Sequence, residues 1–155
     1  MVVNSLTNLN VSVLEMVEFA QNIGARVSSG TDMKVLGDGI ANVYQFNVER
    51  TNDIDVLKSA LQNGAVAIIN VGGDRTGYKG VFSDGGHYLI AYGVLNDKDT
   101  ILMADPYMYN GKYSASYRQA VTVVGYFIYA ASAVVDKDAS NRNPRYTIFT
   151  KKKLI

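Results

Sequence analysis

The sequence predicts an α+β domain in which helices come first and antiparallel strands follow. Apolar residues recur at helical spacing between residues 13 and 23 and again between residues 54 and 61. From residue 65 onwards they form short runs rich in β-branched and aromatic side chains, separated by turn-forming residues. Fourteen glycines and eleven tyrosines, against two prolines, agree with a sheet-rich chain that has tight turns.

Length and composition narrow the class of protein. A chain of 155 residues that is 48% hydrophobic can bury the core of one domain, so we expect a single domain over residues 1–155. A net charge of +1 gives no electrostatic argument for a nucleic-acid partner. No uninterrupted apolar run is long enough for a transmembrane helix. The absence of cysteine excludes disulfides and thiolate metal sites.

The first helical signals lie before residue 40. Residues 1–6 resemble the end of a helix, and we expect the domain to lack the start of this helix because its apolar side chains would be short of partners. Ser12 and Glu15 form a capping-box pattern that begins an amphipathic helix ending near Gly24. Asp32 can cap a short helix through Leu36, closed by glycines at positions 37 and 39.

The middle of the chain alternates between strands and a helix. Residues 43–48 are predicted to form a strand, and Asp53 to cap a helix that ends at Gly64. Residues 65–71 are continuously apolar, which indicates a strand buried on both faces. Residues 72–86 contain six glycines and are predicted to form a long surface loop, a kind of segment that is often functional.

Residues 87–95 and 100–104 are predicted to form a hairpin, because the four residues between them suit a turn. Antiparallel pairing about that turn places His87 opposite residue 108, so Asp105 lies within a few residues of it. Residues 114–120 suit a helical turn, residues 121–135 a strand or bent strand pair, and residues 145–150 an edge strand.

His87 is the single histidine, and its expected proximity to Asp105 suggests a catalytic His–Asp pair. The alternative is a neutral histidine hydrogen-bonded at a strand end, with Asp105 forming a turn before Pro106. A metal site is not expected, because only carboxylates could complete it and no acidic cluster has suitable spacing. Ser83 is the nearest serine, but the chain lacks the Gly-x-Ser-x-Gly pattern of a nucleophilic serine.

Two segments, Gly85-Gly86-His87-Tyr88-Leu89-Ile90-Ala91-Tyr92-Gly93 and Ile101-Leu102-Met103-Ala104-Asp105-Pro106, resemble the papain-like cysteine peptidases of the bacteriocin-processing (double-glycine leader) type. Residues 55–68 and 30–33 resemble upstream segments of the same family. The resemblance implies a papain-like fold in which His87 is the general base and acid and Asp105 orients it. Gly85, Gly86 and Tyr107 would then contact a peptide or protein substrate, with no cofactor and no metal.

The family's nucleophile is a cysteine at the start of a helix, where the helix N-terminus lowers the thiol pKa. No residue of this chain matches it. Residues 1–6 resemble the continuation of that helix, so we expect a parent chain with an upstream cysteine rather than a relative without a nucleophile. As given, the chain is expected to be inactive. Relatives are mostly bacterial and often exported, which favours an extracellular or cell-surface location.

A non-catalytic peptide-binding module of the same fold is the alternative function. Its surface would combine the cleft beside His87, the loop of residues 72–86, and Tyr107, Tyr109 and Tyr113. Tyrosine suits such a surface because it gives a large contact area at a small cost in entropy. These tyrosines could equally do no more than cover the end of the sheet.

Overall fold

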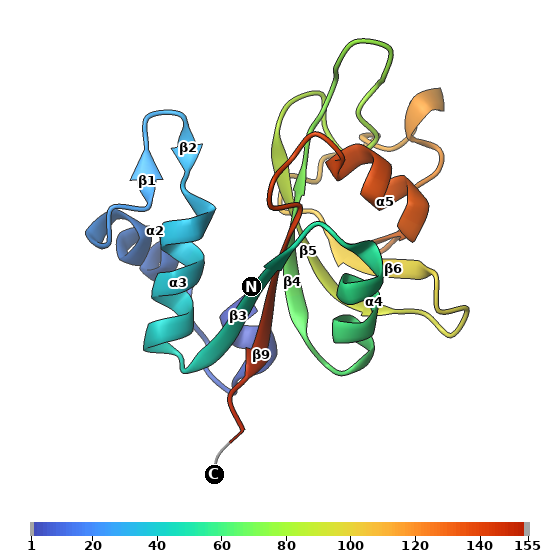
Figure 1. Ribbon diagram of the computed structural model, residues 1–155. Coiled ribbons are helices and arrows are strands. Elements are labelled where there is room, and N and C mark those ends of the chain that lie inside the picture. Colours follow the sequence, from blue (N-terminus) through green and yellow to red (C-terminus); the bar gives the residue numbers. More distant parts are fainter. Residues whose placement is uncertain (1, 154–155) are drawn as a thin grey trace.

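One seven-stranded antiparallel sheet organises the molecule, which is a mixed α+β structure (Figure 1). The computed structural model describes residues 2–153. Across the sheet the strands are β3 (Phe46–Thr51), β9 (Tyr146–Lys151), β4 (Val66–Val71), β5 (His87–Val94), β6 (Thr100–Ala104), β8 (Phe127–Ala131) and β7 (Thr122–Val124). A separate small hairpin joins β1 (Arg26–Val27) to β2 (Gly30–Thr31).

Helices cover both faces of this sheet. Within residues 2–153 they are α1 (Val2–Leu6), α2 (Val13–Asn22), α3 (Met33–Val43), α4 (Ile54–Gln62) and α5 (Ser132–Ala139), with a 3-10 turn η1 (Ser116–Arg118). Figure 1 shows α2, α3 and the β1–β2 hairpin on one side and α4 and α5 on the other. The α+β class and the antiparallel sheet are therefore confirmed, but the helices do not all come first, because α5 lies between β8 and β9.

Strand β4 shows how the two layers are built. Because successive side chains of a strand point to opposite faces, Val66 and Ile68 enter the hydrophobic cluster under α1 and α3. Ala67, Ile69 and Val71 enter the larger cluster under α4 and α5. The prediction that this apolar run is a strand buried on both faces is confirmed.

The first helix is better packed than the sequence suggested. Val2, Val3 and Leu6 are all buried, with Val3 wholly inaccessible, and they join a cluster that includes Phe46 and Phe149. The expectation that these side chains are short of partners is wrong, because the face of the sheet opposite α4 and α5 covers them.

Helix α2 begins as predicted, since Ser12 accepts the Glu15 N–H and Glu15 accepts the Ser12 N–H. Asp32 caps α3 as predicted, but α3 continues past Leu36 to Val43. The glycines that were expected to end it are packing residues: a Cβ at Gly39 would lie 2.6 Å from Cδ1 of Ile23, so the missing side chain lets α2 approach.

Three further boundaries differ from the prediction. Strand β3 begins at Phe46, because residue 43 still belongs to α3. Residues 121–135 form the predicted strand pair, β7 and β8, but the last four of them start α5. The segment predicted as an edge strand is wrong in position: β9 lies between β3 and β4, and four of its six residues are buried.

Residues 72–86 form a loop, as predicted, but part of it is buried. Val81 and Phe82 pack into the larger cluster, and both of their N–H groups donate to Oδ2 of Asp138, at 3.0 Å each. Arg75 also donates to backbone oxygens at the end of α5. The loop is therefore fixed to α5 and is not a surface rim along its whole length.

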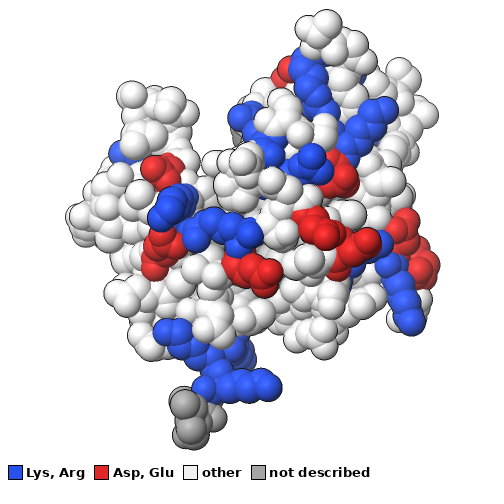
Figure 2. All heavy atoms as spheres, in the orientation of Figure 1, with Lys and Arg blue, Asp and Glu red and all other residues white. Residues whose placement is uncertain are grey.

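The surface carries charges of both signs on the face drawn in Figure 2. A notch in that face separates the side formed by α2, α3 and the β1–β2 hairpin from the side that carries the long loops (Figure 2). Among the described residues, none of the helices has the length and apolar character needed to cross a membrane.

Candidate active site

His87 and Asp105 meet at one end of the β5–β6 hairpin. His87 is the first residue of β5, and Asp105 directly follows β6. The register pairs Ile90 with Ala104, and a bulge between Ala91 and Gly93 shifts it by one residue from simple pairing about the turn. Nε2 of His87 lies 2.7 Å from Oδ1 of Asp105. The hairpin and the predicted proximity of the two side chains are therefore confirmed.

The Asp105 carboxylate is surrounded by donors. Besides His87, its Oδ1 accepts the Tyr107 N–H at 2.9 Å. Its Oδ2 accepts Nζ of Lys112 at 2.5 Å and the hydroxyl of Tyr113 at 2.6 Å. The side chain of Asp105 is fully buried and that of Lys112 is 2% exposed. The site thus contains a buried ion pair next to the imidazole.

These contacts keep the Asp105 carboxyl ionised and the Tyr113 hydroxyl protonated. Burial opposes the charge of Asp105, but the hydrogen bonds from His87, Lys112, Tyr113 and the Tyr107 N–H outweigh it and lower the carboxyl pKa well below its usual range. Burial, reinforced by the bond to Asp105, raises the pKa of Tyr113, so this hydroxyl remains a donor. An ionised carboxylate only accepts, so Nε2 of His87 donates to it and Nδ1 is the ring nitrogen that remains for other groups.

Sequence reasoning missed Lys112. No spacing rule connects it to Asp105, because the loop after Pro106 must fold back before the two can touch. The available signal was a lysine inside a tyrosine-rich segment, which is unusual in a part of the chain expected to cover a sheet end. Lys112 also donates to the carbonyl of Tyr107 at 3.1 Å, which fixes the same loop.

A pocket of about 450 Å³ opens beside His87. The β1–β2 hairpin forms one wall through residues 29–31, and Gly86, His87 and Tyr88 form the opposite wall. Asn70, Pro106 and Arg142 complete the lining. His87 is 16% exposed, so its ring is accessible from this pocket while its carboxylate partner is not.

The other residues predicted to bind substrate lie in different positions. Gly86 lines the pocket, and a Cβ there would lie 2.3 Å from Nη2 of Arg142, so a side chain at this position would displace the guanidinium. Gly85 is exposed and adjacent. Tyr107 is 67% exposed, with its ring centroid 6.4 Å from that of His87. The prediction that Tyr113 belongs to an exposed surface is wrong, because it is buried against Asp105.

The loop that leads to His87 is anchored by Arg118. Its Nη2 donates to Oδ1 of Asp84 at 2.6 Å, and its Nη1 donates to the carbonyl of Lys112 at 3.2 Å. Arg118 is buried, whereas the Asp84 side chain that it binds is 68% exposed. One side chain therefore joins the loop that precedes His87 to the segment that supplies the buried lysine.

No protein-family model matches the chain, and no curated protein matches it significantly. Within residues 2–153 no cluster of three or more His, Cys, Asp or Glu side chains is arranged to hold a metal ion. The site offers an imidazole whose Nε2 is held by an ionised carboxylate, at the wall of an open pocket.

Proposed function

We propose that this chain is a cysteine peptidase-type domain of papain-like fold, in which His87 and Asp105 supply the acid–base part of a Cys-His-Asp triad. The observation that carries the proposal is the 2.7 Å contact between Nε2 of His87 and Oδ1 of Asp105 at the wall of the pocket. A carboxylate held by three further donors keeps the imidazole in the tautomer whose Nδ1 can exchange a proton with a bound group.

The proposed reaction hydrolyses a peptide bond. A thiolate attacks the scissile carbonyl carbon, and the imidazolium of His87 donates its Nδ1 proton to the departing amine. Neutral His87 then accepts a proton from water as the water attacks the thioester, which releases the carboxylic acid and regenerates the thiolate and the imidazolium of His87. Asp105 stays ionised throughout and holds the ring by Nε2.

The thiol must come from outside these 155 residues, which contain no cysteine. Helix α1 packs on the sheet near the strand that begins at His87, since Val2, Ile68 and Ile90 line one small pocket. The chain as given is proposed to be inactive.

The test is to read the coding frame upstream of the Met1 codon and to express the protein that it encodes. If a cysteine is encoded there, we expect peptidase activity that iodoacetamide abolishes and that His87→Ala lowers by several orders of magnitude. Tyr92→Phe, on the same strand, is the matched control and should leave the rate unchanged. Full activity in the His87→Ala protein, or a frame without cysteine, would refute the catalytic proposal.

A non-catalytic peptide-binding module is the second candidate. The observation that favours it is the pair of exposed rings beside His87: Tyr107 and Tyr109 pack edge to face with centroids 5.8 Å apart. Such rings suit peptide contacts that need no thiol. Saturable binding of peptides to this chain that survives His87→Ala, measured by fluorescence anisotropy, would support the module, and its loss in that variant would count against it.

A further inference from the structure

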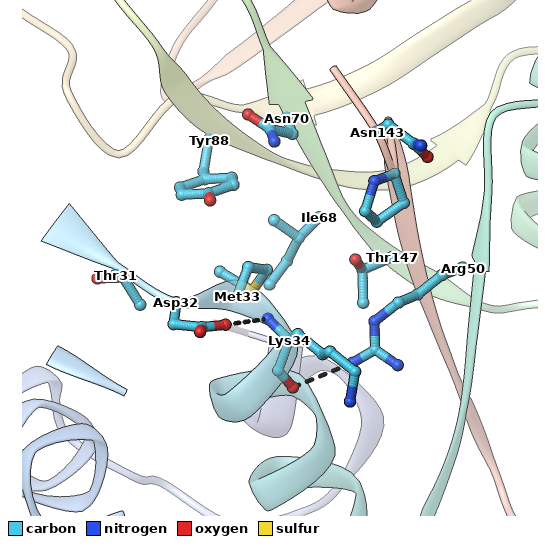
Figure 3. A pocket seen from close by; sticks show the side chains of 11 residues that line it. Thr31, Asp32, Met33, Lys34, Arg50, Ile68, Asn70, Tyr88, Asn143 and Thr147 are labelled. Carbon is cyan, nitrogen blue, oxygen red and sulfur yellow. Dashed lines mark hydrogen bonds between the residues drawn. The ribbon is translucent and has the colours of Figure 1, made fainter. Parts of the chain in front are cut away.

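A second pocket, drawn in Figure 3, adjoins the pocket of His87 where β4 ends and β5 begins. It has a volume of about 300 Å³ and shares Thr31, Asn70 and Tyr88 with the first pocket. We call it the Tyr88 pocket. The N-terminus of α3 forms one wall, and strands β3, β4, β5 and β9 form the others. A peptide that passes His87 can therefore place a neighbouring side chain here.

On strands β4, β5 and β9, three polar side chains line the Tyr88 pocket without internal partners. Asn70, Tyr88 and Thr147 make no side-chain hydrogen bond to any of residues 2–153, although Thr147 is 3% exposed and the other two are half-buried. Buried polar groups are normally satisfied, so groups left open at a pocket wall are available to a ligand. Figure 3 shows Tyr88 and Asn70 along one side of the space and Thr147 along another.

The two cations that line the Tyr88 pocket are paired with a neighbouring carboxylate. Lys34 and Arg50 both bind the carboxylate of Asp38, at 2.9 and 2.7 Å. Opposite Arg50 lies Asp32, whose Oδ1 caps α3 while its Oδ2 bonds to none of the described residues (Figure 3). A carboxylate in the pocket would meet Asp32, and an ammonium group would meet two cations. The wall therefore favours a neutral group that has a donor at one end and an acceptor at the other.

The floor of the pocket is apolar. Met33, Ile68 and Pro144 provide it, and Figure 3 shows Met33 and Ile68 between the polar walls. An aliphatic stem can lie against these side chains while its polar end reaches Asn70, Tyr88 and Thr147. Burial of the stem adds to binding in proportion to the apolar area that it removes from water.

We propose that the Tyr88 pocket binds a primary carboxamide side chain, glutamine or asparagine, of the peptide that occupies the His87 pocket. The carboxamide has the donor and acceptor that the lining requires, and it carries no charge. That the carboxamide belongs to a peptide substrate rests on the proposed function. Binding of the carboxamide itself depends only on the lining of the Tyr88 pocket and needs no thiol.

The test uses this chain and four matched probes: the N-acetyl, N-methylamide derivatives of glutamine, glutamate, lysine and leucine. Each is titrated into the nitrogen-15-labelled protein and followed by amide chemical shifts. We expect the glutamine probe to shift the amides of Asn70, Tyr88 and Thr147, and to bind at least about five-fold more tightly than the others, the factor expected for one hydrogen bond.

Three variants locate the contacts. Tyr88→Phe and Thr147→Val each remove one hydroxyl with little change of shape, and each should weaken the glutamine probe by about five-fold. Tyr92→Phe makes the same change on the same strand outside the pocket and should have no effect. Circular dichroism of all three variants establishes that they are folded.

The outcomes separate this proposal from the proposed function. Equal or tighter binding of the glutamate, lysine or leucine probe, or shifts located elsewhere, would overturn the carboxamide assignment even if the peptidase activity is found. Glutamine-selective binding that Tyr88→Phe and Thr147→Val weaken would uphold it even if no upstream cysteine exists.

Discussion

The buried pair of Lys112 and Asp105 can be tested by a double-mutant cycle. In Lys112→Met the carboxylate loses one charge-assisted bond but keeps three donors, so we expect a loss of about 1.5–3 kcal/mol in the free energy of unfolding. In Asp105→Asn the ammonium group stays buried without a counter-charge, and only neutral carbonyl oxygens remain to accept from it. Breaking a buried pair in this way costs about 3–5 kcal/mol.

The double variant should be more stable than the two single losses predict, because no buried charge is left without a counter-charge. We expect a coupling free energy of at least about 2 kcal/mol. Urea unfolding followed by far-ultraviolet circular dichroism measures it, and the chain has no tryptophan to serve instead. Losses that add to within about 0.5 kcal/mol would refute the view that the two charges stabilise each other.

The same pair predicts a dependence on pH. The pKa of Asp105 is lower in the folded protein than in the unfolded chain, so the unfolded state binds more protons as the solution becomes acidic. The contribution of Asp105 to the free energy of unfolding is present above the ordinary carboxyl pKa. It is lost as the pH falls towards the lower pKa that Asp105 has in the folded protein. Lys112→Met should reduce this acid sensitivity, because it removes one of the bonds that lower the pKa.

Three further predictions concern the scaffold. Asp138→Ala leaves two buried loop N–H groups without an acceptor and should cost about 2–5 kcal/mol in urea unfolding, whereas Asp138→Asn keeps an acceptor and should cost much less. Burial raises the pKa of Asp138 in the folded protein. The contribution of Asp138 to the free energy of unfolding should therefore weaken as the pH rises past the ordinary carboxyl pKa, and Asp138→Asn should remove this pH dependence. Gly39→Ala should lower the free energy of unfolding by about 1–3 kcal/mol, because the packed side chains of Ile23 and Phe19 must move to make room. Gly37→Ala meets the flexible end of an arginine first and should cost less. Ser12→Ala should cost about 1 kcal/mol through loss of the α2 cap, measured by thermal denaturation; no change would contradict the capping role.

Local signals predicted the parts of the fold that depend on near neighbours. The caps at Ser12, Asp32 and Asp53 each act on amides within three residues, so the sequence is enough to locate them. The contact of His87 with Asp105 could be predicted for the same reason, because a short turn sets the register of one hairpin.

The parts that could not be predicted depend on distant segments. Whether Gly39 ends a helix or lets another helix approach is decided by α2, which the local pattern does not include. Lys112 reaches Asp105 only after a loop folds back, and the Tyr88 pocket combines residues from α3 and four strands. No periodicity within one element carries that information.

The central position of β9 has a consequence for how the molecule assembles. This strand pairs Tyr146 with Thr51 on one side and with Ile69 on the other, and it contributes Ile148 to one hydrophobic cluster and Phe149 to the other. Until β9 has been synthesised, β3 has no neighbour in the sheet and both clusters are incomplete. Contacts this far apart in sequence make folding slow. The His87 hairpin can form early, but the Tyr88 pocket, which needs Thr147, is among the last features to appear.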